Sequence, residues 1–244
     1  MKKLLVSFAV LLSIGCSNKQ ENSLETSQTP NILAKTITCS PGNDNNSNDA
    51  VGAMHNACLD ASSVYFDDNP FNIDLICNTI EEEMYNNYGF SISISSSDVD
   101  ELSAAAIEDG ISTFIDTTTE DGVIMNSIWK TLSSPTYQEG NSYCDAKSYI
   151  LSIEGDVMEN SNLSTEERNN VLVFTSTLRH SLYYWELNSS GDDGEMNAMN
   201  VAVGLIDAGA AVAFFFATDG SLGDRLKGAA AFGAGVSAMA AHFF

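Results

Sequence analysis

The chain has 244 residues, of which 44% are hydrophobic and 18% are charged, a composition that supports a sizeable hydrophobic core. It carries 33 acidic residues against 10 basic ones, for a formal net charge of −23 at pH 7. Such a surface repels nucleic acid and anionic lipid headgroups, so the composition argues against a nucleic-acid-binding function.

Residues 1–15 have the pattern of an export signal. Lys2 and Lys3 precede a mostly apolar stretch that ends in Ser13-Ile14-Gly15 before Cys16. This pattern resembles a bacterial lipoprotein signal peptide, in which the cysteine is acylated and becomes the new N-terminus. Leu usually stands where this chain has Ser13, so plain secretory cleavage is the alternative. We expect a cell-envelope protein, an outer-membrane lipoprotein facing the periplasm or the cell surface, held in the lipid bilayer by acylated Cys16.

Residues 16–47 are predicted to form a flexible polar tether, because Ser, Asn, Gln, Glu and Thr dominate its sequence. The tether runs into the loop 42–49, GNDNNSND, whose alternating Asp and Asn resemble the start of a calcium-binding loop. The resemblance fails further on, because Asp49 replaces the turn glycine and His55 replaces the bidentate Glu. We therefore interpret the loop as a turn and a helix cap.

Residues 48–200 are predicted to form an acidic helical domain. Apolar residues recur at helical spacing in segments that begin near Asp49, after Pro70, near Ser97, and at Gly122, Tyr143 and Ser164. The clearest helix start is the capping box formed by Ser164 and Glu167. The stretch 90–95, FSISIS, alternates like a strand but lacks a partner, so we expect an extended connector. The predicted fold class is all-α, a helical bundle.

The closing segment, residues 201–244, contains two Gly/Ala-rich apolar stretches on either side of DGSLGDRLK, which predicts a helical hairpin. Small residues recur every four positions, so each helix could approach another backbone closely. Three placements of the hairpin are possible: buried in the bundle, inserted conditionally into lipid, or stably in a membrane. Asp207 would cost about 2.5 to 3.5 kcal/mol at the middle of a membrane. We therefore favour a hairpin packed on the helical domain.

Four cysteines remain besides Cys16. In an exported chain an even number favours two disulfides, in this case among Cys39, Cys58, Cys77 and Cys144, with the connectivity left open. Free buried thiols are one alternative. A metal site that combines Cys58 with His55 is the other, but no CxxC pair supports zinc. We expect neither a metal nor a cofactor.

His55, Asn56 and Asp60 form a polar cluster on an otherwise core-directed helical segment. The sequence has no HExxH, GxSxG or phosphate-binding glycine motif. We expect a buried His55 that hydrogen-bonds a second helix, near Tyr184 and Trp185. A ligand-binding or catalytic role for the cluster is the alternative.

Two stretches resemble a family of uncharacterised Bacteroidota lipoproteins. The run Gly52-Ala53-Met54-His55-Asn56-Ala57-Cys58-Leu59-Asp60 is similar to their motif Gly-x-x-His-Asn-x-x-Leu-Asp, and residues 163–185, LSTEERNNVLVFTSTLRHSLYYW, are similar to a later segment. The resemblance implies a helical lipoprotein and no particular activity. We expect a lipid-anchored binding or structural module with an unknown protein or glycan partner, and not an enzyme. A membrane-active effector that uses the C-terminal hairpin is the alternative.

Overall fold

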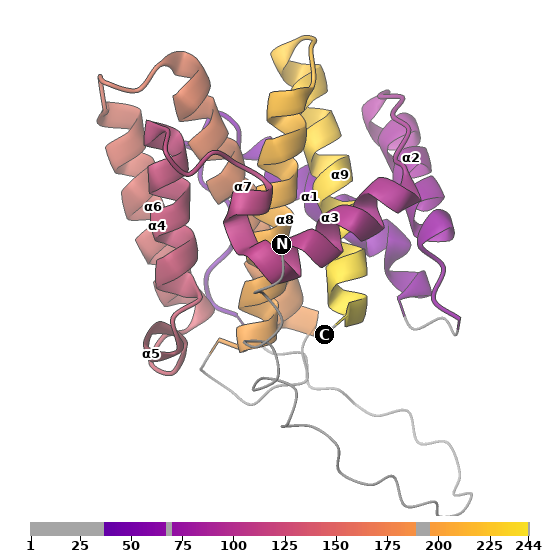
Figure 1. Cartoon of the computed structure of the whole chain (residues 1–244), viewed down its shortest axis with the longest axis horizontal. Coiled ribbons are helices and arrows are strands. Elements are labelled where there is room, and N and C mark those ends of the chain that lie inside the picture. Colours follow the sequence, from indigo (N-terminus) through magenta and orange to yellow (C-terminus); the bar gives the residue numbers. More distant parts are fainter. Residues whose placement is uncertain (1–36, 67–69, 189–195, 244) are drawn as a thin grey trace, which may run out of the picture. The chain divides into compact units, whose positions relative to one another are not determined.

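The computed structural model describes residues 37–66, 70–188 and 196–243, and these residues form helices and no strand (Figure 1). The predicted all-α class is confirmed. The predicted signal peptide, Cys16 and most of the predicted tether lie outside the described residues.

The helices of the first half are α1 (Ala50–Ser62), α2 (Ile73–Tyr88), α3 (Ser96–Asp109) and α4 (Glu120–Leu132). They are followed by α5 (Pro135–Gln138), α6 (Tyr143–Glu159), α7 (Thr165–Asn188), α8 (Ala198–Ala217) and α9 (Leu222–Phe243). Single 3-10 turns, Ser63–Tyr65 and Gly110–Thr113, extend α1 and α3. The connector at residues 90–95 is neither helix nor strand, as predicted.

Local side chains fix several helix ends. The predicted capping box of α7 is present: the Ser164 amide donates to Glu167 Oε2 at 2.8 Å, and the Glu167 amide donates to Ser164 Oγ at 3.2 Å. Helix α3 begins earlier than predicted, because Ser95 caps it by accepting from the Asp98 amide. Helix α2 ends at Gly89, whose φ of 61° is in the left-handed region that glycine adopts without strain.

The α8–α9 hairpin is the centre of the bundle. Helix α8 packs against α9 and α7, and α9 packs against α1, α2 and α3 (Figure 1). Within the described residues α8 is the one helix long and apolar enough to cross a bilayer, and 72% of its apolar stretch is buried inside the protein. Neighbouring amphipathic helices therefore shelter the two Gly/Ala-rich segments in this structure.

Aromatic rings, as well as backbone, pack closely against glycines of the hairpin. A Cβ atom at Gly209 would lie 2.3 Å from Cδ2 of Phe114, and one at Gly228 would lie 2.2 Å from Cε1 of Phe214. Only Gly233 of these positions meets a backbone, with the Asp207 carbonyl oxygen 3.2 Å from its virtual Cβ. The four-residue spacing of small side chains, which includes Gly209 and Gly233, predicted close approach of another backbone. The structure corrects this at Gly209, because the Phe114 ring fills the space there, whereas backbone does approach Gly233.

We predict opposite effects for two Gly→Ala substitutions in helices. Gly209→Ala places a methyl group against Phe114 and should lower the free energy of unfolding by about 1 to 3 kcal/mol. Gly155→Ala in α6 has no atom within 4 Å of the new Cβ and should raise the free energy of unfolding by about 0.5 to 1 kcal/mol, through helix propensity alone. Urea unfolding of both variants measures the two signs, and a Gly209→Ala variant as stable as Gly155→Ala would contradict the packing described.

Candidate functional site

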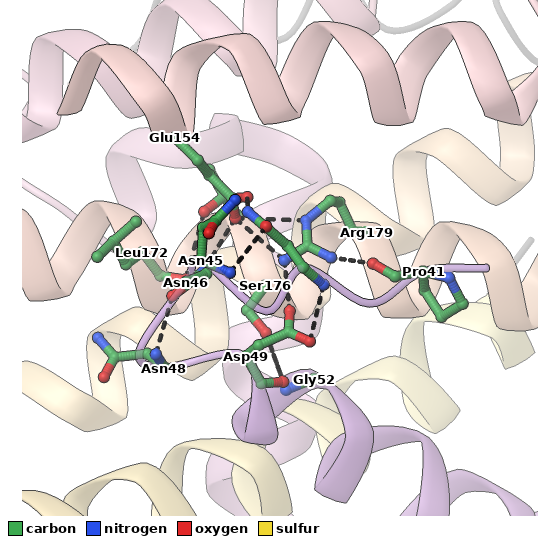
Figure 2. A network of polar contacts seen from close by, with 12 residues as sticks. Pro41, Asn45, Asn46, Asn48, Asp49, Gly52, Glu154, Leu172, Ser176 and Arg179 are labelled. Carbon is green, nitrogen blue, oxygen red and sulfur yellow. Dashed lines mark hydrogen bonds and ion pairs between the residues drawn. The ribbon is translucent and has the colours of Figure 1, made fainter. Parts of the chain in front are cut away.

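Residues 37–49, which we call the N-terminal strap, are held against α6 and α7 by a buried ionic cluster (Figure 2). Arg179 of α7 is fully buried, and its Nη2 lies 3.1 Å from Oε1 of Glu154, which is buried on α6. The same guanidinium pairs with the carboxylate of Asp49 and donates to the carbonyl oxygen of Pro41. Because buried charges are costly unless they are paired and hydrogen-bonded, this cluster fixes where the strap lies.

The strap asparagines complete the cluster around Glu154. Nδ2 of Asn43 donates to Oε2 at 2.6 Å, and Nδ2 of Asn46 donates to Oε1 at 2.7 Å. The Asn-rich loop that resembled a calcium site therefore satisfies a carboxylate of the protein itself. The strap also corrects the predicted tether, because residues 37–47 pack on the helical domain and hydrogen-bond to it.

Asp49 does not cap α1 as predicted, since its side chain makes no capping hydrogen bond. Its carboxylate accepts instead from the Asn43 amide at 3.1 Å and pairs with Arg179. Burial alone would raise the pKa of Asp49, but the His180 ring, whose Nε2 lies 3.6 Å from Oδ2, and the paired guanidinium of Arg179 outweigh it and lower the pKa to about 2. Asp49 is therefore ionised over the physiological range.

Among the four cysteines that the structure describes, one disulfide forms, between Cys39 of the strap and Cys144 of α6. Cys58 and Cys77 are free thiols, so the predicted second disulfide is wrong. Both lie in the core, on α1 and α2, where burial together with nearby glutamates raises the pKa of each thiol to about 12. They pack as small hydrophobic side chains. Within the described residues, no group of His, Cys, Asp and Glu is arranged to hold a metal ion.

The structure does not bring His55, Asn56 and Asp60 together as an open site. His55 is fully buried, Asn56 is half-buried, and Asp60 is exposed. The Asn56 side chain joins its neighbour to α7: its Oδ1 lies 3.1 Å from Nδ1 of His55, and its Nδ2 donates to the carbonyl oxygen of His180 at 2.8 Å. On the other side of the His55 ring, 3.6 Å from Nε2 and without a hydrogen bond to it, lies a packing partner that the sequence pattern did not assign to this cluster.

That partner is Asp207, at the middle of α8. Its Oδ2 lies 3.6 Å from Nε2 of His55 and accepts hydrogen bonds from Ser237 Oγ at 2.8 Å and from Ser181 Oγ. Trp185 joins the same group, because its Nε1 donates to Ser237 Oγ at 3.2 Å. We call these five residues the core cluster. They come from α1, α7, α8 and α9, so the cluster lies where the hairpin meets its two main partners.

Burial keeps both titratable groups of the core cluster neutral. It raises the pKa of Asp207 to about 8 and lowers the pKa of His55 to about 4. Asp207 Oδ1 and His55 Nε2 have no hydrogen-bond partner within the described residues. Both side chains have 0% exposure, so their residue types suit proton transfer but a substrate has no access to them. The cluster therefore fixes the position of the hairpin.

Glycines make room for the imidazoles on either side of α1. A Cβ at Gly52 would lie 2.4 Å from Cδ2 of His180, and a Cβ at Gly233 would lie 3.3 Å from Cδ2 of His55. Gly52 is the first residue of the Gly-x-x-His-Asn motif. The motif therefore contains both the glycine that leaves space for His180 and the buried His55.

The pKa shifts predict how stability depends on pH. Asp207 has a folded pKa far above its ordinary value of 3.8, so its contribution to stability falls as pH rises from about 4 to about 8. His55 has the opposite sign, because its folded pKa is below its ordinary 6.5 and its contribution falls as pH drops from 6.5 to about 4. The two effects offset each other below pH 6.5, and Asp207 acts alone above it.

We therefore predict that the free energy of unfolding decreases by about 2 kcal/mol between pH 6.5 and pH 8, since each pH unit between the two pKa values of Asp207 contributes about 1.4 kcal/mol. In Asp207→Asn this decrease should disappear, because the amide does not titrate. Denaturant unfolding at a series of pH values measures both slopes. An equal decline in the variant would show that another group causes it.

The surface offers a hollow along α4 that the sequence analysis did not predict. It has a volume of about 750 Å³ and is lined by Val123, Asn126, Ser127, Lys130, Thr131, Ser134, Thr136, Tyr137 and Asn141. A second hollow, of about 340 Å³, shares Val123 and Ser127 with it and extends to Ile153, Asp156, Val157 and Asn160 near α6. We call the two together the α4 groove.

Three polar side chains of the α4 groove have no intramolecular partner among the described residues, whereas the Asn141 amide donates to the carbonyl oxygen of Tyr137 at 2.7 Å. Asn126, Ser127 and Thr131 make no side-chain hydrogen bond within the described part of the chain. The ring of Tyr137 lies beside them, and burial, with Asp145 and Tyr149 nearby, raises the pKa of its phenol to about 12, so the hydroxyl stays protonated. In the sequence, the Ser-Pro dipeptide at 134 and 135 indicates only that the preceding helix ends here, and nothing marks the groove itself.

Comparisons of the chain with protein-family models, with curated proteins and with solved structures found no match. The resemblance to the Bacteroidota lipoprotein family therefore stays a prediction.

Proposed function

We propose that this chain is a lipid-anchored cell-envelope module that binds a neutral, hydroxyl-rich ligand, such as a glycan, in the α4 groove. The observation that carries the proposal is the row of hydroxyl and amide side chains in the groove that have no partner within the described residues. The proposal gives the chain a binding role and not a catalytic one.

The chemistry of the groove suits an uncharged ligand. Ser and Thr hydroxyls and Asn amides each supply a donor and an acceptor, which is what a ligand with many hydroxyl groups requires. Lys130 and Asp156 are the charged lining residues, so the lining is neutral although the chain carries a net charge of −23. Tyr137 adds an apolar ring face beside these polar groups.

The position of the groove supports a preformed site. Helices α4 and α6 both pack on α7, which is almost entirely buried between Asn170 and Leu182. Side chains on well-packed helices hold their positions without a ligand, so binding needs little reordering. The strap is fixed to α6 by the Cys39–Cys144 disulfide and to α7 by Arg179, so the domain is bound firmly to the part of the chain that leads back towards Cys16.

The anchor is tested by replacing Cys16. In a Gram-negative host the wild-type protein should sediment with membranes and carry acyl chains at its N-terminus, whereas Cys16→Ser should be recovered in the soluble fraction. Each buried methylene of an acyl chain adds about 0.8 kcal/mol of membrane affinity, so the difference should be nearly complete. Membrane sedimentation that is unchanged in Cys16→Ser would remove the lipid-anchor proposal and leave the binding proposal standing.

The groove is tested on a glycan array that carries neutral and anionic glycans, followed by calorimetry with the neutral glycan that binds best. Each of Asn126→Ala and Thr131→Ala should raise Kd by about 2- to 12-fold, because a lost hydrogen bond costs about 0.5 to 1.5 kcal/mol. Ser148→Ala is the matched control, since this exposed hydroxyl on α6 donates to the Cys144 carbonyl oxygen and lies outside the groove. An array without neutral binders, or equal Kd values in all variants, would contradict the proposal.

A further inference from the structure

Another hollow lies away from the α4 groove, at the C-terminal end of α9. It has a volume of about 680 Å³, and three helix ends form it: the start of α2, the start of α3 and the last turn of α9. Its lining residues are Pro70, Phe71, Ile73, Asp74, Ser96, Ser97, Asp100, Met239, His242 and Phe243. We call it the α9 pocket.

The floor of the α9 pocket is aromatic and apolar. The rings of Phe71 and His242 are stacked, with their centroids 4.0 Å apart and their planes at 7°. Met239 is buried beside them, whereas Phe243 is 50% exposed at the edge of the pocket. An exposed phenylalanine beside a stacked pair presents apolar area and a ring face to whatever enters the pocket.

The charged lining residues of the α9 pocket are carboxylates. Asp74 and Asp100 are both exposed, and neither pairs with a basic side chain within the described residues. No Lys or Arg lines the pocket. An anionic ligand would meet uncompensated like charge at this site, and a chain with a net charge of −23 draws cations towards its surface.

We propose that the α9 pocket binds an organic ammonium ion that carries an aromatic or aliphatic group. The apolar group would lie on Phe71, Met239 and Phe243, and the ammonium would lie at the carboxylates of Asp74 and Asp100. A cation near a ring face is attracted by the ring quadrupole, in addition to its attraction to the carboxylates. A bare Ca²⁺ or Mg²⁺ ion fits less well, because these ions need six or more oxygen ligands and gain nothing from an aromatic floor.

The ligand proposed for this site is a cation with an apolar group, whereas the ligand proposed for the α4 groove is neutral and polar. The lining residues of the two sites do not overlap, so either proposal can fail without the other.

The test uses three small probes and the full-length mature protein: 2-phenylethylammonium, the neutral 2-phenylethanol, and the ammonium ion without an apolar group. In calorimetry at low salt, 2-phenylethylammonium should bind at least 10-fold more tightly than either of the others. The double variant Asp74→Asn with Asp100→Asn should lose this preference for the charged probe. The control Asp98→Asn, an exposed carboxylate in the first turn of α3 that does not line the pocket, should keep it.

The signal of the Met239 methyl group locates the bound probe. In a spectrum of the protein with ¹³C-methyl methionine, this signal should shift with the same saturation curve as the calorimetric binding, and Phe71→Leu should weaken both. Four results would each overturn the proposal. They are equal binding of 2-phenylethanol and 2-phenylethylammonium, a preference for the charged probe that persists in the double Asn variant, no saturable binding, and a Met239 signal that does not shift.

Discussion

The fold depends on one neutral carboxyl group in an apolar helix. Asp207 lies at the middle of α8, where Ser181 of α7, Ser237 of α9 and His55 of α1 converge on its Oδ2. A buried polar group without partners would cost several kcal/mol, so α8 is stable only at the register where the serine hydroxyls of α7 and α9 reach Asp207. A single residue thereby fixes the relative positions of three helices, in a segment whose Ala and Gly side chains specify little by themselves.

Small side chains bury little apolar area, so close packing stabilises the hairpin more than the burial of large apolar side chains does. Phe114 and Phe214 fill the spaces at Gly209 and Gly228, and the His55 and His180 rings fill those at Gly233 and Gly52. The residue types that suit acid–base chemistry are thereby enclosed in the core. The hollows of the surface lie at the periphery instead, along α4 and near the ends of α2, α3 and α9.

Local signals in the sequence predicted much of this fold. Apolar periodicity located the helices, with the start of α6 at Tyr143, and the Ser164–Glu167 box marked the start of α7. Long-range pairing could not be predicted in this way. The Cys39–Cys144 disulfide spans 105 residues and the Asp49–Arg179 ion pair spans 130, and periodicity within a helix carries no information on such partners. Burial of His55 was predictable from its apolar neighbours, whereas its pairing with Asp207 depends on how two distant helices pack.

The most direct test of the central claim is hydrogen–deuterium exchange of α8 in the full-length protein, measured in solution and with liposomes. If the core cluster holds the hairpin inside the bundle, the amides around Asp207 will be among the slowest to exchange, and liposomes will leave their rates unchanged. Rapid exchange of α8 in solution, followed by strong protection when liposomes are added, would show that the hairpin belongs in lipid and would contradict its placement at the centre of the bundle.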